Sequence, residues 1–202
     1  MQGPRAIRCS AVSRDRLFVA VLVAAAFGGA AFFTYLSMSS FVLEKQFGLT
    51  PQQFSLVFAA NAIANIAGGQ LSRVLVRRAG PLRMYLTGVT TAAAVALAAF
   101  ASTLAGWGLA AVVASLAVYL FASGLGGPNG STLALAHHGP RAGTAAAFLG
   151  FGQFALGPVI APLASSLTGT TALTMTATMG AASVVAAVIA WTTVRPAARA
   201  PE

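Results

Sequence analysis

Residues 124–163 read GLGGPNGSTLALAHHGPRAGTAAAFLGFGQFALGPVIAPL, and this stretch decides the fold class of the chain. It contains two apolar segments joined by a tight basic turn, His137-His138-Gly139-Pro140-Arg141. Neither segment shows the apolar–polar alternation of a membrane-spanning strand. Each segment carries one amide, Asn129 or Gln153, which lipid alone would not tolerate. The stretch therefore predicts two transmembrane helices that belong to a larger helical bundle.

The composition of the whole chain supports this class. Of its 202 residues, 57% are hydrophobic and 7% are charged, whereas a soluble domain carries about 25% charged residues. The net charge of +9 comes mainly from arginines in short clusters between apolar runs. This distribution favours the lipid bilayer, with its anionic headgroups, as the partner and argues against nucleic acid. The one cysteine, Cys9, excludes an internal disulfide framework.

Six apolar runs predict an all-α membrane protein with six transmembrane helices. Thr50 and Pro51 mark one helix start as the N-cap and the first helical residue. The first run is too long for the apolar region of a cleaved signal peptide, so it is expected to remain as a helix. The predicted helices cover residues 17–43, 51–72, 82–104, 109–136, 142–167 and 171–194. The domains follow as a basic cytoplasmic segment 1–16, a six-helix domain 17–194 and a cytoplasmic tail 195–202.

The basic residues predict the orientation of the helices. Eleven of the twelve lysines and arginines lie in the N-terminus, the second and fourth loops and the C-terminus. The other three loops contain only Lys45, which Glu44 offsets. Because short loops rich in Lys and Arg stay in the cytoplasm, both termini are expected to be cytoplasmic.

Polar side chains within the predicted helices are candidates for a substrate path. Asn61 and Asn65 share one stripe of the second helix with Phe58, and Gln153 lies near the middle of the fifth. The interiors of the third and sixth helices contain only serine and threonine as polar groups, so these two helices are expected to support the other four. The predicted path consists of Tyr35, Asn61, Asn65, Asn129, Phe148 and Gln153. The alternative is that the amides only hold helices together, as they commonly do in membranes.

Prolines within the apolar runs predict helix bends. Pro128, Pro158 and Pro162 each remove a backbone donor from a predicted helix. Bends of this kind are expected near the site of alternating access in a transporter. The neighbouring glycines have a simpler interpretation, in which they only permit close packing of helices.

The chain lacks the residues that proton transfer, metal binding and proteolysis within the membrane would need. Apart from Arg83 at the very start of the third predicted helix, no Asp, Glu, Lys or Arg falls inside a predicted helix, so the chain offers no obvious proton carrier of its own. His137 and His138 have no carboxylate or thiol cluster beside them, and no metal or other cofactor is expected. An intramembrane serine protease would need a histidine on a helix facing its serine. The chain is therefore not expected to be an enzyme.

Motifs along residues 14–195 resemble the C-terminal six-helix half of a major facilitator superfamily transporter, and specifically of the Bcr/CflA drug-resistance subfamily. The matching segments are Arg14-Asp15-Arg16, Tyr35-Leu36-Ser37, Phe47-Gly48-Leu49, Phe58-Ala59-Ala60-Asn61, Pro128-Asn129 and Ala142-Gly143-Thr144-Ala145, with Gly150 and Gln153-Phe154. The resemblance implies proton-driven efflux of drugs or small metabolites across the bacterial inner membrane. It also implies that the first, second, fourth and fifth helices line the cavity.

Two features depart from this family's pattern. Gly69-x-Leu71 with Arg73, Arg77 and Arg78 resembles the superfamily's basic loop motif, but Arg73 occupies the acidic position of that motif. The chain also has six helices, whereas a complete transporter of this kind has twelve. Three interpretations follow: a truncated product, half of a split transporter with an N-terminal half as partner, or a parallel homodimer. The competing function is a non-transporting assembly or regulatory subunit of the membrane.

Overall fold

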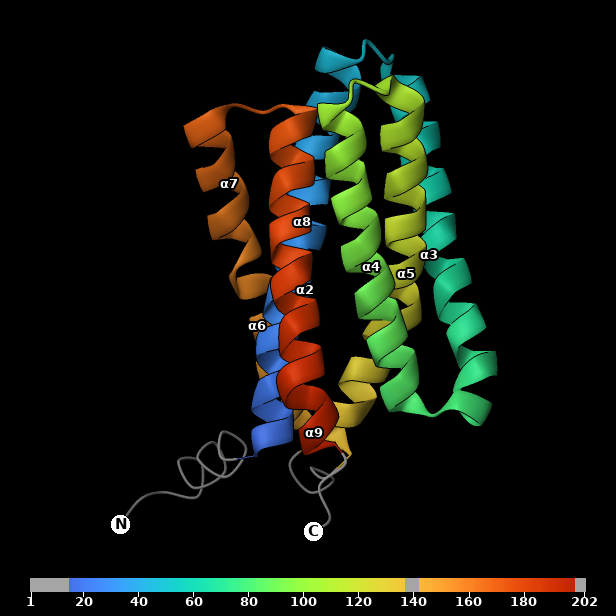
Figure 1. Ribbon diagram of the computed structural model, residues 1–202, viewed down its shortest axis with the longest axis vertical. Coiled ribbons are helices and arrows are strands. Elements are labelled where there is room, and N and C mark those ends of the chain that lie inside the picture. The colour runs from blue at the N-terminus through green and yellow to red at the C-terminus, as the bar shows by residue number, and fades with distance from the viewer. Residues whose placement is uncertain (1–14, 137–141, 199–202) are drawn as a thin grey trace.

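The computed structural model describes residues 15–136 and 142–198. Within these ranges, six helical spans are long and apolar enough to cross a membrane. The described chain is helical throughout its regular structure, which confirms the predicted all-α class (Figure 1). The expected basic segment up to residue 14, the 137–141 turn and residues 199–202 of the tail lie outside the described residues.

Three of the spans are single helices, and the other three consist of consecutive helical segments. The elements are α2 (Arg16–Ser40) with the π-helical turn η1 (Phe41–Gln46), α3 (Pro51–Ala79), α4 (Pro81–Leu104), α5 (Gly108–Leu135), α6 (Ala142–Ala155) with α7 (Gly157–Thr168), and α8 (Ala172–Ile189) with the π-helical turn η3 (Ala190–Val194) and α9 (Arg195–Ala197).

Local sequence signals set the start of α3. The Thr50 side chain accepts a hydrogen bond from the Gln53 backbone N–H at 3.3 Å, and the Gln53 side chain accepts one from the Thr50 N–H at 2.9 Å. Pro51 occupies the first turn, where a backbone N–H would have no partner in any case. The start predicted from Thr50 and Pro51 is confirmed.

Three predicted helix ends are wrong. The first helix was expected to end at Leu43, but the span continues through η1 to Gln46. The second helix was expected to end at Ser72, but α3 continues through Arg73 to Ala79. Arginine is a good helix former, and its long side chain lets the charge reach water while the backbone stays helical. The sixth span was expected to end at Val194, but it continues as α9 to Ala197. Proline tolerates this position because it lies in the first turn of α9.

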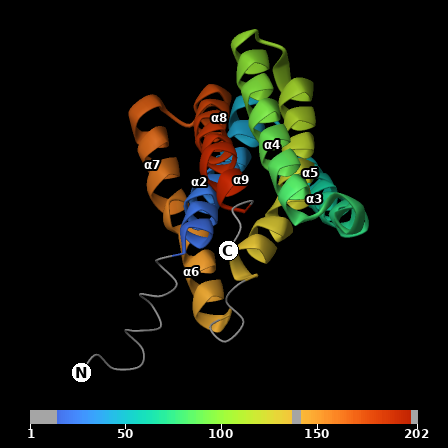
Figure 2. The same cartoon turned by 60° about the horizontal axis from the view of Figure 1, so that its bottom comes forward.

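The prolines differ in what the chain does around them. The fifth span is interrupted at Leu156, so that α6 ends just before Gly157 and Pro158. Pro128 and Pro162 both lie inside helices that are not interrupted. Figure 2 shows the yellow end of α5, which contains Pro128, leaning away from the direction of its first half. The interruption lies beside Pro158 and the lean of α5 lies at Pro128, whereas the bend at Pro162 remains a prediction.

The last three spans pack in the same pattern as the first three. The helix α5 packs against α3 and α4, and α2 correspondingly packs against α6, α7 and α8. The pairs α4 with α8 and α2 with α5 complete the bundle. Exchanging the first three spans for the last three therefore leaves the set of contacting pairs unchanged, as in an inverted repeat. As a result, α2 and α5 are central, and α3 and the α6–α7 span lie on opposite flanks (Figures 1 and 2).

Glycines bring α3 and the central helix α5 into backbone contact. A Cβ atom on Gly124 would lie 2.0 Å from the Asn65 carbonyl oxygen, and one on Gly68 would lie 2.0 Å from the Phe121 carbonyl oxygen. The α3–α5 crossing therefore excludes any side chain at these two positions. By contrast, Gly127 has nothing within 4 Å of the position of its Cβ atom. Close packing of helices therefore explains Gly124 and Gly68 and does not explain Gly127.

Candidate substrate cavity

A cavity of about 900 Å³ lies between the central helices of the bundle. Its walls on α2 and α5 are built mainly of small residues such as Gly28, Ala25 and Gly127. Because these side chains are short, residues of the helices behind them, including Tyr85 on α4 and Ser183 on α8, also line the space. The expectation that the third and sixth helices only support the other four is therefore wrong.

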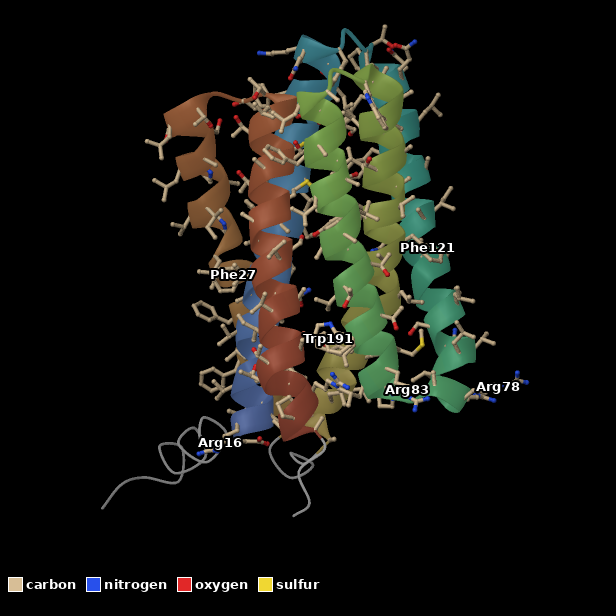
Figure 3. All side chains as sticks on the ribbon, in the orientation of Figure 1. Arg16, Phe27, Arg78, Arg83, Phe121 and Trp191 are labelled. Carbon is tan, nitrogen blue, oxygen red and sulfur yellow. The ribbon has the colours of Figure 1, made fainter. Side chains whose placement is uncertain are left out.

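The cavity is located toward one end of the bundle. The last turns of α3 and the first residue of α4 line it, through Arg73, Val76 and Pro81. Both the start of α2 and the end of α9 lie at this end (Figure 1). Arg16, Arg78 and Arg83 also gather there (Figure 3). The cavity therefore extends from the arginine-bearing end toward the middle of the bundle, where Tyr119 and Phe32 line it.

Three of the six predicted path residues line this cavity: Asn65, Asn129 and Gln153. Two of them hold α3 against α5. The Asn65 amide donates a hydrogen bond to the Leu120 carbonyl at 2.9 Å. The buried Asn129 amide donates to the Ser72 hydroxyl at 2.7 Å and to the Leu125 carbonyl at 2.8 Å. These amide donors are used within the protein, so they act first as links between helices.

Gln153 differs from the other two amides. Its side chain is exposed, and among the described residues it has no hydrogen-bond partner. Its backbone carbonyl lies against Gly29, where a Cβ atom would come within 1.7 Å of the oxygen. This contact fixes the helix backbone while the amide remains available. Gln153 is therefore the predicted path residue best placed to donate and accept hydrogen bonds with a ligand.

Tyr35 and Asn61 form a separate group with Phe58. The Asn61 amide donates a hydrogen bond to the Tyr35 hydroxyl at 3.2 Å. The Tyr35 and Phe58 rings stack with centroids 6.0 Å apart and an interplanar angle of 7°. None of the three lines the cavity. This Tyr35–Asn61–Phe58 cluster instead joins α2 to α3 on the side of the cavity away from the arginines.

Phe148 also lies apart from the cavity. Its ring is 39% exposed on the flank formed by α6, and it is absent from the cavity wall. A single sequence could not separate this outward position from an inward one, because the run from Ala145 to Phe151 is apolar or small on every face. The role of Phe148 as an aromatic wall remains a prediction.

The cavity contains polar residues that the sequence did not select. Tyr119, Ser123 and Ser183 line it, and the Ser183 hydroxyl oxygen is itself buried. Tyr119 shared a helical stripe with Asn129, so its spacing carried a usable signal. Arg73 was noted only as a departure from a loop motif, yet it also lines the cavity. No group of three or more potential metal ligands occurs among residues 15–136 and 142–198.

Six helices that are long and apolar enough to cross a membrane surround a partly polar cavity, an arrangement typical of membrane transport proteins. Residues 6–202 match the sequence profile of the Major Facilitator Superfamily, and the chain belongs to this family. It is therefore an integral membrane protein with one half of the superfamily's fold.

The comparison with curated proteins gives one relative. The chain is 31% identical over 175 residues to the uncharacterized MFS-type transporter YdgK of Bacillus subtilis (strain 168). The match covers 85% of this chain and 42% of that protein. The chain thus spans less than half of the length of the curated relative that it matches. No solved structure matches the chain.

Proposed function

We propose that this chain acts as a C-terminal half in a proton-coupled efflux transporter of the Bcr/CflA drug-resistance type. Its substrates would be drugs or small metabolites. The observation that carries this proposal is the 900 Å³ cavity, whose walls combine apolar surface with the unpartnered amide of Gln153. Pockets that are mostly apolar with a few placed polar groups suit small organic ligands.

The arginines support an orientation for this transport. Arg16, Arg78 and Arg83 lie at the end of the bundle toward which the cavity extends (Figure 3). Under the positive-inside rule that end faces the cytoplasm. The cavity would then receive substrate from the cytoplasm of a bacterium and release it across the inner membrane.

A second six-helix unit is part of the proposal. In the most apolar stretch of α3, only 11% of the residues are buried, and the corresponding value for the α6–α7 span is 17%. These two flanks could contact an N-terminal half or a second copy of the chain. Such a unit would also provide the coupling carboxylate, because no Asp or Glu among the described residues lines the cavity.

The Tyr35–Asn61–Phe58 cluster would close the outer end of the path in this conformation. Replacing Asn61 with leucine should weaken the closure. One lost hydrogen bond is worth about 1 kcal/mol, which corresponds to an increase of about fivefold in the population with the outer end open. The measurement is the rate at which an external, membrane-impermeant maleimide labels a cysteine introduced at Phe54, with Cys9 changed to serine.

Asn65→Leu provides the control for this labelling experiment. Asn65 donates to Leu120 on α5 and makes no contact with the Tyr35 hydroxyl. Its substitution should leave the labelling rate unchanged, because α2 stays attached to α3. Equal labelling rates in the Asn61 and Asn65 variants would show that the cluster does not close the path.

Dye retention in a pump-deficient bacterium tests the transport proposal. The chain is expressed alone and together with a six-helix N-terminal half of the same subfamily. Retention of a fluorescent dye should fall several-fold when both halves are present, because both walls of the cavity are then complete. Retention equal to that of the empty vector would overturn the proposal and favour the assembly or regulatory subunit. A fall with the chain alone would identify a second copy as the partner.

A further inference from the structure

We propose that Arg73 makes the cavity a binding site for organic anions that carry a carboxylate, sulfonate or phosphate group. The inference deepens the proposed function, on which it rests, by naming the substrate class. Arg73 is the one ionisable Arg, Lys, Asp or Glu side chain in the cavity wall among the described residues. All other polar groups in that wall are amides, hydroxyls or backbone atoms.

Within residues 15–136 and 142–198, no acidic side chain neutralises this charge. The acidic residues of the chain are Asp15, Glu44 and Glu202. The Asp15 carboxylate accepts hydrogen bonds from the backbone N–H groups of Leu17 and Phe18 at the start of α2. Glu44 lies in η1, at the opposite end of the bundle from Arg73. Neither acidic residue that the structure describes therefore compensates the positive charge of the cavity, and this charge raises the local concentration of anions.

The geometry around Arg73 leaves its guanidinium available. One of its terminal nitrogens donates to the Gln70 side-chain oxygen at 3.1 Å, and Gln70 also lines the cavity. A guanidinium has five N–H donors in a planar fork that matches carboxylate and phosphate oxygens. The hydrogen bond to Gln70 orients the guanidinium and occupies only some of its N–H donors.

The first turn of α4 adds charge of the same sign. Its first residue, Pro81, lines the cavity, and no acidic residue occurs in that turn. The N-cap is Gly80, which provides no side-chain acceptor for the free N–H groups. The positive end of the helix dipole is thus left uncompensated near the cavity.

The orientation of the helices in the membrane does not by itself explain Arg73. Arg77, Arg78 and Arg83 already provide positive charge at this end, and none of them lines the cavity. Arg73 lies four residues before Arg77, which places it about 6 Å deeper along the helix. A residue needed only to mark the cytoplasmic side would not have to reach this depth.

The test measures binding of two probe ions of opposite charge. The purified full chain is placed in nanodiscs of neutral phosphatidylcholine and titrated with 8-anilinonaphthalene-1-sulfonate or tetraphenylphosphonium by calorimetry, with empty nanodiscs subtracted. The wild-type chain should bind the sulfonate more tightly than the phosphonium. Arg73→Gln should raise the Kd for the sulfonate about tenfold, or about 1.4 kcal/mol, and Arg73→Lys should restore most of the binding.

Arg78→Gln is the matched control, because it removes the same charge from a residue outside the cavity wall. Solvent screening should limit its effect on the Kd to about twofold. Equal effects of the two Gln variants, tighter binding of the phosphonium by the wild type, or no binding of either probe would each overturn the inference.

The two proposals fail in different ways. Absence of dye efflux in cells, together with sulfonate binding that depends on Arg73, would defeat transport and leave the anion site. Efflux that Arg73→Gln leaves unchanged, together with unchanged sulfonate binding, would defeat the anion site and leave transport.

Discussion

Alanine in place of Gly124 should destabilise the bundle by about 3 kcal/mol, the upper part of the range for overpacked interiors. The added Cβ would lie 2.0 Å from the Asn65 carbonyl oxygen, and that atom belongs to the α3 backbone. A helix backbone has no rotamer through which to move away, so α3 and α5 must separate. Separation also weakens the hydrogen bonds that Asn65 and Asn129 donate across the crossing.

Gly127→Ala is the control for this substitution. Gly127 lies on the same helix three residues later, and nothing lies within 4 Å of the position of its Cβ atom. The variant should be as stable as the wild type or more stable, because alanine favours a helix by up to about 1 kcal/mol over glycine. Unfolding of both variants in sodium dodecyl sulfate, followed by circular dichroism, gives the comparison. Equal stability of the two variants would mean that α3 and α5 do not cross at Gly124.

The contrast between these glycines shows that the sequence alone does not predict which glycine lies at a helix crossing. The density of glycine in residues 124–163 indicated either close packing or mobile helices. Both Gly124 and Gly127 fit either interpretation, since both lie in the same glycine-rich part of one apolar run. Only the crossing of α3 over α5 places one of them against a backbone carbonyl. A contact between residues so far apart in the chain depends on tertiary packing, which periodicity within one helix does not report.

Helix starts and helix ends were not equally predictable. The start at Pro51 depends on Thr50 and Gln53, which lie within one turn of it. The end at Ala79 depends on how far a helix can extend beyond the lipid. An arginine such as Arg73 can lie in a helix that continues as well as at the end of one. The charge of arginine indicated the membrane boundary, and it was wrongly taken to mark the end of the helix as well.

For the polar residues, too, the sequence predicted position along a helix but not contacts between helices. The sequence correctly placed amides on α3, α5 and α6, and three of them line the cavity. It could not distinguish an amide that bonds to a neighbouring helix from one that remains free. The distinction depends on acceptors such as the Leu120 carbonyl, which lies 55 residues from Asn65 in the chain.

Leucine in place of Gln153 should reduce transport about tenfold and leave the stability of the bundle nearly unchanged. The Gln153 side chain is exposed and has no hydrogen-bond partner among the described residues, so its removal breaks no bond within the protein. A ligand that bonded to this amide would lose one or two hydrogen bonds, and each is worth about 0.5 to 1.5 kcal/mol. Initial rates of efflux from cells that express both halves give the transport value.

Asn129→Leu should have the opposite profile. It removes the donor to the Ser72 hydroxyl and leaves that buried oxygen without its partner, at a cost of about 1 to 3 kcal/mol. The loss should appear in the unfolding free energy, and transport per folded molecule should fall less than in Gln153→Leu. If both variants lowered stability equally and left transport per folded molecule unchanged, the Gln153 amide would be a link between helices like the other two. The separation of the two profiles is expected because one amide is bonded within the protein and the other faces the cavity.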